Sequence, residues 1–286
     1  MTTKRRIILF TALVLASILA NIAFFRQLFA SSIQSDFSSH ILLIPFLSLA
    51  LIFRKRAAIF KDVSYSVFLG GTISAIALIL LISASVLKIR LEASDALSAR
   101  ALTIVILWIG FFIFCFGTEC FRKALFPMLF LLMMVPIPKS LLDAIIVVLQ
   151  KGSAEFSAVL FKLTGTPYYR DGMTFALPRI KVEIAPECSS IRSSLALLIS
   201  CLLAGHLILR NFWSKFVFVL LAVPMAMVKN GIRIVTLSLL SIHIDKRFLE
   251  SSDLHREGGI VFFIAALLLL WPVLWLLRRS ERKSNL

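Results

Sequence analysis

The chain has 286 residues, of which 59% are hydrophobic and 16% are charged, and its mean hydropathy is +0.95. A soluble globular domain averages about 45–50% apolar and about 25% charged residues, so this composition excludes one. It also excludes a disordered chain, a collagen-like repeat and a disulfide-stapled miniprotein. The net charge of +16 comes from basic residues that punctuate apolar runs, which favours membrane topology over nucleic-acid binding. We therefore expect an all-α polytopic membrane protein with no nucleic-acid partner.

A helix needs about 20 apolar residues to cross a hydrocarbon core about 30 Å thick. The sequence predicts about eight such spans, at residues 7–25, 36–53, 66–87, 99–117, 124–138, 190–209, 216–242 and 259–277. The second is irregular because Asp36 and His40 lie at its start, and the fifth ends at Pro136-Ile137-Pro138, which breaks a helix. No repeat or linker is apparent, so we expect one domain over residues 1–286.

Lysine and arginine gather at alternate span ends, which the positive-inside rule assigns to the cytoplasm. These basic residues are at positions 4–6, 54–56, 61, 122–123, 210, 215, 278–279 and 282–283. Both termini are then cytoplasmic, and the protein is a multi-pass protein of the cytoplasmic (inner) membrane. A cleaved signal peptide is the alternative for the first span, but seven further spans favour a retained anchor.

The longest stretch between predicted spans, residues 139–189, lies on the outer face in this topology. Its first half predicts an amphipathic helix along the interface with a kink at Gly152, and an ordinary buried helix fits equally well. The polar side of this helix consists of Ser140, Asp143, Gln150, Lys151, Glu155 and Lys162. In the second half, the Asp171-Gly172 turn and the alternation over residues 180–184 predict a small extracytoplasmic β-hairpin.

The four cysteines fall into two classes. Cys115, Cys120 and Cys201 lie within spans or at their inner ends, which predicts buried core thiols. Cys188 lies on the outer face just before the sixth span and has no disulfide partner on that face. At a helix N-terminus the dipole favours the thiolate, and backbone amides such as that of Ser189 can receive an oxyanion. Cys188 is therefore a candidate nucleophile, with a small packing residue as the alternative.

Arg233 lies in an otherwise apolar helix, at the predicted depth of Cys188. An arginine at the centre of a span costs about 2.5–3.5 kcal/mol on insertion scales, so it usually has a partner or a task. Snorkelling to the outer headgroups is the alternative. Asn230 lies three residues earlier on the same helical face, and Arg192 follows Cys188 by four residues.

Two histidines, His255 before the last span and His40 at the start of the second, reach the same outer face. A loop histidine is usually only solvated, yet Cys188, Arg233 and His255 meet one face at one depth from three spans. Such a set supports acyl transfer, in which a thiolate attacks a carbonyl, a histidine moves the proton, and arginine or backbone amides hold the oxyanion. No metal-ligand spacing or phosphate-binding loop occurs, so we expect neither a metal nor a cofactor.

These residues lie in blocks that resemble the exosortase/archaeosortase family of membrane cysteine transpeptidases, from about residue 36 to 260. The most specific blocks are Glu187-Cys188-Ser189-Ser190-Ile191-Arg192, Asn230-Gly231-Ile232-Arg233-Ile234, and His255 with Gly258. Two further blocks are Ser39-His40-Ile41-Leu42-Leu43-Ile44-Pro45 followed by Arg54-Lys55-Arg56, and Phe126-Pro127-Met128 with Val135-Pro136-Ile137-Pro138. Ser190 departs from the commoner family pattern, which has glycine there, so the subfamily and its substrate motif stay open.

The resemblance implies that Cys188 is the nucleophile, that Arg233 stabilises the oxyanion and that His255 is the acid/base. We expect Arg192, Asn230, Ser189 and His40 to support the site. The implied substrates are exported proteins with a C-terminal sorting motif (Pro-Glu-Pro in the best-known type), a transmembrane helix and a basic tail. The acceptor would be an envelope glycan or lipid, and membrane lipids surround the enzyme.

Three other functions remain open from the sequence. A transporter or channel would also use Arg233 and broken helices, but it would carry polar residues through the whole depth of several spans. A structural scaffold would tolerate substitution at all three site residues. A hydrolase would differ from a transpeptidase only in the nucleophile that resolves the thioester, which the sequence does not specify, as it does not specify the oligomeric state.

Overall fold

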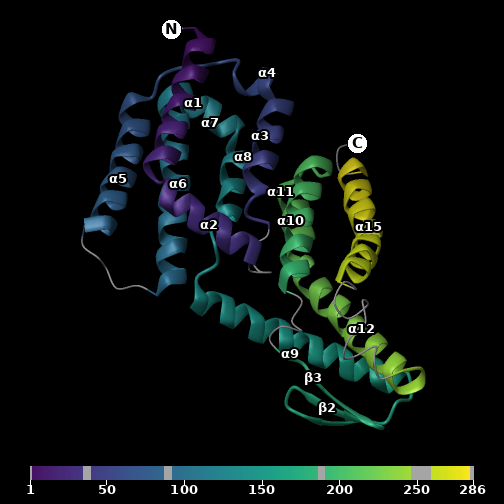
Figure 1. Cartoon of the computed structure of the whole chain (residues 1–286). Coiled ribbons are helices and arrows are strands. Elements are labelled where there is room, and N and C mark those ends of the chain that lie inside the picture. The colour runs from purple at the N-terminus through teal and green to yellow at the C-terminus, as the bar shows by residue number, and fades with distance from the viewer. Residues whose placement is uncertain (1, 35–39, 87–91, 186–190, 246–258, 284–286) are drawn as a thin grey trace. The chain divides into compact units, whose positions relative to one another are not determined.

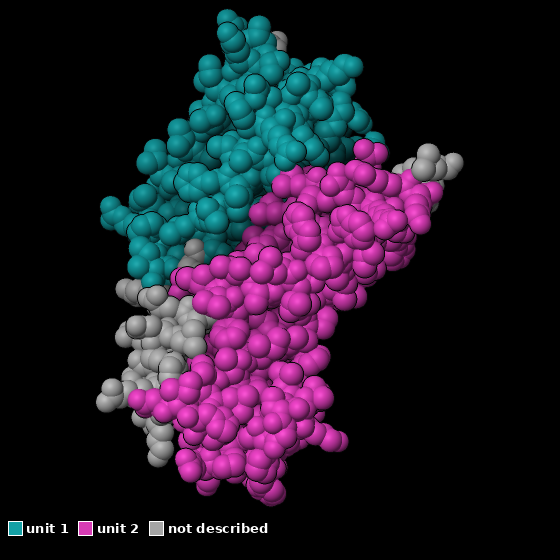
Figure 2. All heavy atoms as spheres, turned by 90° about the vertical axis from the view of Figure 1, so that its right-hand side faces the viewer, with its two compact units in different colours: residues 1–141 teal, residues 142–286 magenta. Residues whose placement is uncertain are grey.

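The computed structural model describes residues 2–34, 40–86, 92–185, 191–245 and 259–283 (Figure 1). The chain forms two compact units, residues 1–141 and residues 142–286, which are coloured separately in Figure 2. Each unit is described by itself below. Whether the two units make the single domain expected from the sequence stays a prediction.

The described part of the first unit is built from helices. They are α1 (Thr3–Ala20), α2 (Ile22–Gln34), α3 (Ile44–Arg54), α4 (Arg56–Ile59), α5 (Val67–Val86), α6 (Ala93–Phe116), α7 (Thr118–Lys123), α8 (Leu125–Phe130) and the 3-10 helix η1 (Leu131–Met134). Helix α6 is the core element, with Phe112 and Phe116 buried against Phe10 and Phe60. Helix α5 packs closely on α6 because a Cβ at Gly70 would lie 2.3 Å from the backbone nitrogen of Phe114.

The predicted first span is broken in the structure. Helices α1 and α2 meet at a bend of 79°, with Asn21 between them. The Asn21 side chain donates a hydrogen bond to the Ser17 carbonyl at 2.9 Å and accepts one from Arg100 of α6, also at 2.9 Å. An asparagine that bonds its own backbone competes with the helical pattern, which explains why the helix ends here.

The second unit combines helices with a small sheet, and α9 (Lys139–Leu163) enters it from the end of the first unit. Its other described elements are β1 (Tyr169–Asp171), β2 (Thr174–Leu177), β3 (Ile180–Glu183), α10 (Ile191–Ile208), α11 (Phe212–Leu220), α12 (Ala222–His243) and α15 (Gly259–Lys283). Figure 1 shows α9 lying crosswise to α10 and α15. That direction suits a helix along the interface better than one parallel to the spans, although its place in the membrane stays a prediction.

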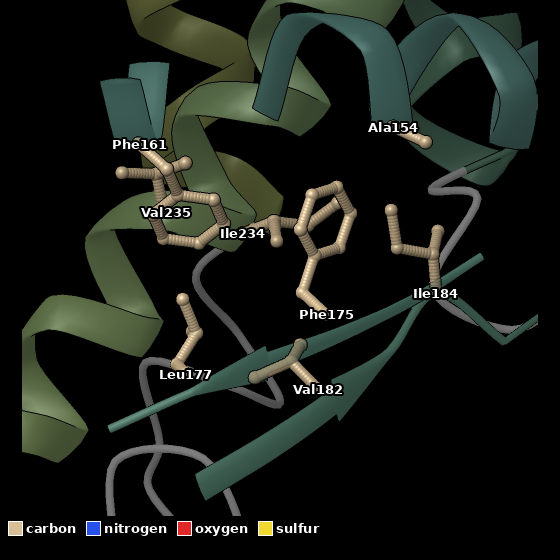
Figure 3. Close-up of a cluster of buried hydrophobic side chains, with 8 residues drawn as sticks. All are labelled: Ala154, Phe161, Phe175, Leu177, Val182, Ile184, Ile234 and Val235. Carbon is tan, nitrogen blue, oxygen red and sulfur yellow. The ribbon is translucent and has the colours of Figure 1, made fainter. Parts of the chain in front are cut away.

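The sheet confirms the predicted hairpin and adds a strand to it. The antiparallel order is β1-β2-β3, with Asp171 opposite Thr174 and Leu177 opposite Ile180. Gly172 supplies the left-handed turn residue, with φ of +56°. One face of the sheet packs on α9 and α12 in a buried apolar cluster (Figure 3). The cluster contains Ala154, Phe161, Phe175, Leu177, Val182, Ile184, Ile234 and Val235.

The structure is an all-α polytopic membrane fold with one small sheet, as expected, although the number of candidate spans among the described residues is not exactly eight. Within the described residues, five helices are long and apolar enough to cross a membrane, or six if α1 and α2 are one bent span. The five are α6, α9, α10, the continuous pair α11–α12, and α15. The segments that fall short include α3, which starts only at Ile44, and α8 with η1, which ends before Pro136. Proline and polar residues therefore divide some apolar runs into shorter helices, although the composition of each run alone predicts a whole span.

Candidate functional site

The structure describes four of the seven predicted site residues. Arg233 and Asn230 lie on α12 and Arg192 lies in the first turn of α10, all in the second unit. His40 lies just before α3 in the first unit, where its ring is hydrogen-bonded to the backbone of Met133. Cys188, Ser189 and His255 lie outside the described residues. The meeting of Cys188, Arg233 and His255 therefore stays a prediction.

A polar layer connects α9, α10 and α12 in the second unit. It consists of Gln150 and Ser153 on α9, Ser193 on α10, and Lys229 and Asn230 on α12. Of these side chains, Ser153, Lys229 and Asn230 are at most 3% exposed. Because buried polar groups need hydrogen-bond partners, this layer fixes which faces of the three helices meet.

Asn230 joins α12 to α9, while its supporting role in the active site stays a prediction. Its side-chain amide donates a hydrogen bond to Ser153 Oγ at 3.0 Å. The next residue, Gly231, explains how the two helices come so close. A Cβ at Gly231 would lie 3.0 Å from the Phe156 Cβ and 3.3 Å from the Ser157 backbone nitrogen. The Asn230-Gly231 pair therefore places Arg233 on a helix held tightly against α9.

Lys229 is a residue that the sequence analysis missed. Its side chain is 3% exposed, and its ammonium is hydrogen-bonded to Ser193 Oγ at the start of α10. The signal was visible in the sequence, because a lysine four residues before an intramembrane arginine is as costly as the arginine itself. The bond links the helix that follows the Cys188 segment to the helix that carries Arg233.

Gln150 corrects the expected polar side of α9. Its side chain is buried, and its amide donates a hydrogen bond of 2.7 Å to the carbonyl oxygen of Ile184. Ile184 follows β3 and lies four residues before Cys188. The neighbouring Lys151 and Glu155 are exposed as expected, and Glu155 pairs with Arg170 of β1 at 2.9 Å.

Gly152 of α9 has a packing role in the structure. Helix α9 is continuous through this residue. A Cβ at Gly152 would lie 2.2 Å from Met227 Sδ of α12. Gly152 and Gly231 thus face each other's helices and allow a close crossing, the arrangement that small residues provide between membrane helices.

Arg233 lies where the polar layer gives way to the apolar cluster. It is half-buried, one turn beyond Lys229 on the same side of α12, and its neighbours Ile234 and Val235 belong to the cluster beneath the sheet. Arg192 is exposed. The polar layer before Arg233 and the apolar cluster after it therefore hold the helix backbone that carries its guanidinium.

An apolar cavity of about 340 Å³ adjoins the polar layer. It lies between the first half of α9, the first two turns of α10 and the start of α12. Ala222 and Ala226 line it from α12, on the side that continues to Lys229, and Ser194 is the polar residue of its lining. On this side of α12, the part at Ala222 and Ala226 is therefore suited to apolar groups, and the part at Lys229 is suited to charged ones.

The other chemistry-bearing residues behave as core residues where the structure describes them. Cys115, Cys120 and Cys201 are free and buried, which confirms the expectation of core thiols. Burial raises the pKa of the Cys120 thiol, which lies outside the long spans. No group of three His, Cys, Asp or Glu side chains within the described ranges is arranged to hold a metal ion.

Comparison with known proteins assigns the chain to a family. No curated protein and no solved structure matches it. A family model described as transmembrane exosortase (Exosortase_EpsH) matches residues 31–272, a range that contains the polar layer, Arg233, and the sequence positions of Cys188 and His255. Because the match covers most of its length, the chain belongs to the transmembrane exosortase family.

Proposed function

We propose that this protein is a membrane-embedded cysteine transpeptidase that cleaves the C-terminal sorting signal of exported proteins at the outer face of the cytoplasmic membrane. Membership of the exosortase family supports a protein-sorting role in the membrane. The finer assignment rests on Cys188 as nucleophile, Arg233 as oxyanion donor and His255 as acid/base.

One observation carries the proposal. The described residues on both sides of the Cys188 segment are bonded to the helices that hold Arg233 in place. Before it, the Ile184 carbonyl accepts the bond from Gln150 of α9, and after it, Ser193 is bonded to Lys229 of α12. Catalytic groups must be held within about 0.5 Å of their working geometry, which requires such attachment.

The proposed reaction proceeds in two steps. The Cys188 thiolate adds to the scissile carbonyl, and the negative charge that develops on the oxygen is stabilised by the Arg233 guanidinium. The C–N bond then breaks, His255 gives a proton to the leaving amine, and a thioester remains on Cys188. In the second step an acceptor nucleophile loses its proton to His255 and displaces the thiolate. The acceptor is an amine or hydroxyl of the envelope.

The polar layer argues against the transport alternative. A transport path needs polar or hydrated surface through the depth of the membrane. In the described part of the second unit, the polar groups that join α9, α10 and α12 form one layer, and the cavity beside it is apolar. We therefore favour a site at one depth over a route through the bilayer.

The test is processing of a candidate substrate in cells that produce the wild type or a Cys188→Ala or Cys188→Ser variant. Mass spectrometry of the new substrate C-terminus reads the product. We expect both variants to reach the membrane at normal levels and to process nothing. Cys201→Ala is the matched control, because it removes a buried free thiol of α10 and should retain processing. Normal processing by Cys188→Ala would refute the proposal.

A further inference from the structure

Lys229 is a buried cation whose described partner is a neutral hydroxyl. The four ion pairs of the described residues do not include it, and its hydrogen-bond partner is Ser193 Oγ. An ammonium has three donors, and one hydroxyl neither fills them nor balances the charge. A buried charge without a counter-charge is strongly unfavourable, so the position of Lys229 needs an explanation beyond packing.

A second cation makes the arrangement more unfavourable. Arg233 lies one turn further along the same side of α12, and its charge interacts with that of Lys229. Two like charges at this spacing destabilise a helix in water, and the effect grows in an apolar surrounding. An anion at the Lys229 ammonium would offset the repulsion and fill the remaining donors of that ammonium.

We propose that Lys229 is a substrate-binding residue whose ammonium binds a carboxylate of the peptide substrate close to the scissile bond. The inference rests on the proposed function, because a transpeptidase meets its anion on a peptide, and side-chain carboxylates are the anions that a peptide carries. The apolar cavity, which Ala226 lines one helical turn before Lys229, then takes the apolar residues beside that carboxylate. Ser193 holds the ammonium in place while the site is empty.

A bracing role is the main rival explanation. In that case the Lys229–Ser193 bond only ties α10 to α12, and its loss affects every substrate equally. The two explanations differ in one measurable quantity, the dependence of processing on the charge of the substrate. A brace does not sense that charge, whereas a carboxylate-binding residue does.

The experiment is a double-mutant cycle between enzyme and substrate. Each Asp and Glu within the substrate's cleavage region is changed in turn to its amide, and processing rates are compared for wild-type enzyme, Lys229→Met and Lys229→Arg. Hydrogen bonds to charged groups are strong enough that we expect an amide at one position to slow the wild type about 10- to 100-fold. Lys229→Met should be slowed to a similar degree and should no longer distinguish acid from amide. Lys229→Arg should still distinguish them.

Lys215→Met on α11 is the matched control, since it makes the same chemical change outside the polar layer, and it should keep the wild-type discrimination. Equal slowing of acid and amide substrates by Lys229→Met, with discrimination intact, would overturn the inference in favour of a brace. So would a wild-type enzyme insensitive to every amide substitution. Should Lys229→Met fail to accumulate in membranes, Lys229→Arg and the wild-type substrate series still decide the question.

Two further outcomes distinguish a peptide carboxylate from a lipid phosphate, and a failure of this inference from a failure of the proposed function. If Lys229→Met instead abolishes a dependence on anionic phospholipid in vesicles with and without phosphatidylglycerol, the anion is a lipid phosphate and the carboxylate assignment is wrong. If Cys188→Ala processes normally, the proposed function itself fails. Loss of processing in Cys188→Ala together with an additive cycle at Lys229 removes only the present inference.

Discussion

Each of the two units places a cation in an apolar helix, but the surroundings of the two cations differ. In the first unit, Arg100 of α6 donates to Asn21 at the bend between α1 and α2, and its guanidinium lies 5.6 Å from the Phe24 ring. In the second unit, Lys229 and Arg233 lie one turn apart on α12, and Lys229 and its neighbour Asn230 are hydrogen-bonded to serine hydroxyls of α10 and α9. A single cation bonded at the bend between two helices has a structural task, whereas the two adjacent cations of α12 belong to the site for which we propose a ligand.

The largest effect that would sharpen this comparison is expected at Arg233. Replacement by lysine keeps the charge but loses the planar fork of donors, so the oxyanion would be held poorly. Loss of one oxyanion donor lowers turnover about 100- to 1,000-fold, and we expect Arg233→Lys to do so. Thermal unfolding in detergent should remain close to wild type. Near-normal turnover would indicate that backbone amides stabilise the oxyanion instead. Arg233 would then differ from Arg100 less than we propose.

Arg100→Met should show the opposite behaviour. A hydrogen bond from a charged group contributes about 1.5–3 kcal/mol, and the loss of the bond to Asn21 should destabilise the first unit by that order. Asn21→Ala should give a similar change, because it removes the other partner. Chemical unfolding measures the difference, and processing per folded molecule should be unchanged. A specific loss of processing would show that Arg100 is more than structural.

A pair of glycines extends the comparison to packing. Gly70→Ala brings a Cβ onto the Phe114 backbone between α5 and α6, and Gly231→Ala brings one onto Phe156 and the Ser157 backbone between α12 and α9. Overpacking typically costs about 1–3 kcal/mol, so both variants should be less stable. We expect only Gly231→Ala also to reduce processing per folded molecule, since it displaces the helix that carries Arg233. Equal processing by the two variants would argue that the polar layer tolerates displacement.

The smallest effect is expected where a charge pair is exposed. Lys123 donates a hydrogen bond to Asp62 at 2.6 Å, which lowers the pKa of that carboxyl. The stabilisation is therefore present at neutral pH and is lost as the pH falls through the lowered pKa of Asp62. Lys123→Met should raise this pKa toward its ordinary value, as measured by NMR titration. Thermal stability at pH 7 should not change measurably, because exposed pairs contribute little.

Local patterns in the sequence predicted local structure well. The Asp171-Gly172 turn and the alternation after it identified two strands correctly, because a turn and its strands are set by neighbouring residues. The buried thiols followed from their place in apolar runs. The exact number of spans did not follow, because a bend of 79° and several shorter apolar helices divide runs that composition treats as whole spans.

The candidate site divides in the same way. The spacing of Asn230 to Arg233 is a property of one helix, and it placed both residues on the same side of α12. Lys229 and Gln150 were missed or misplaced because their partners, Ser193 and Ile184, lie on other elements, and a single sequence does not show such contacts. Amphipathic spacing placed Gln150 on the water side, but the sheet covers that position with a carbonyl acceptor.

The cluster beneath the sheet has a mechanical consequence. Ile234 and Val235 belong to the same buried cluster as Phe175, Leu177 and Val182, so the helical turn after Arg233 is packed directly against the strands. We expect a protein that binds the strands to restrict the conformation of that helical turn as well. The strands are therefore in packing contact with the turn that follows Arg233, in a helix that is long and apolar enough to cross a membrane.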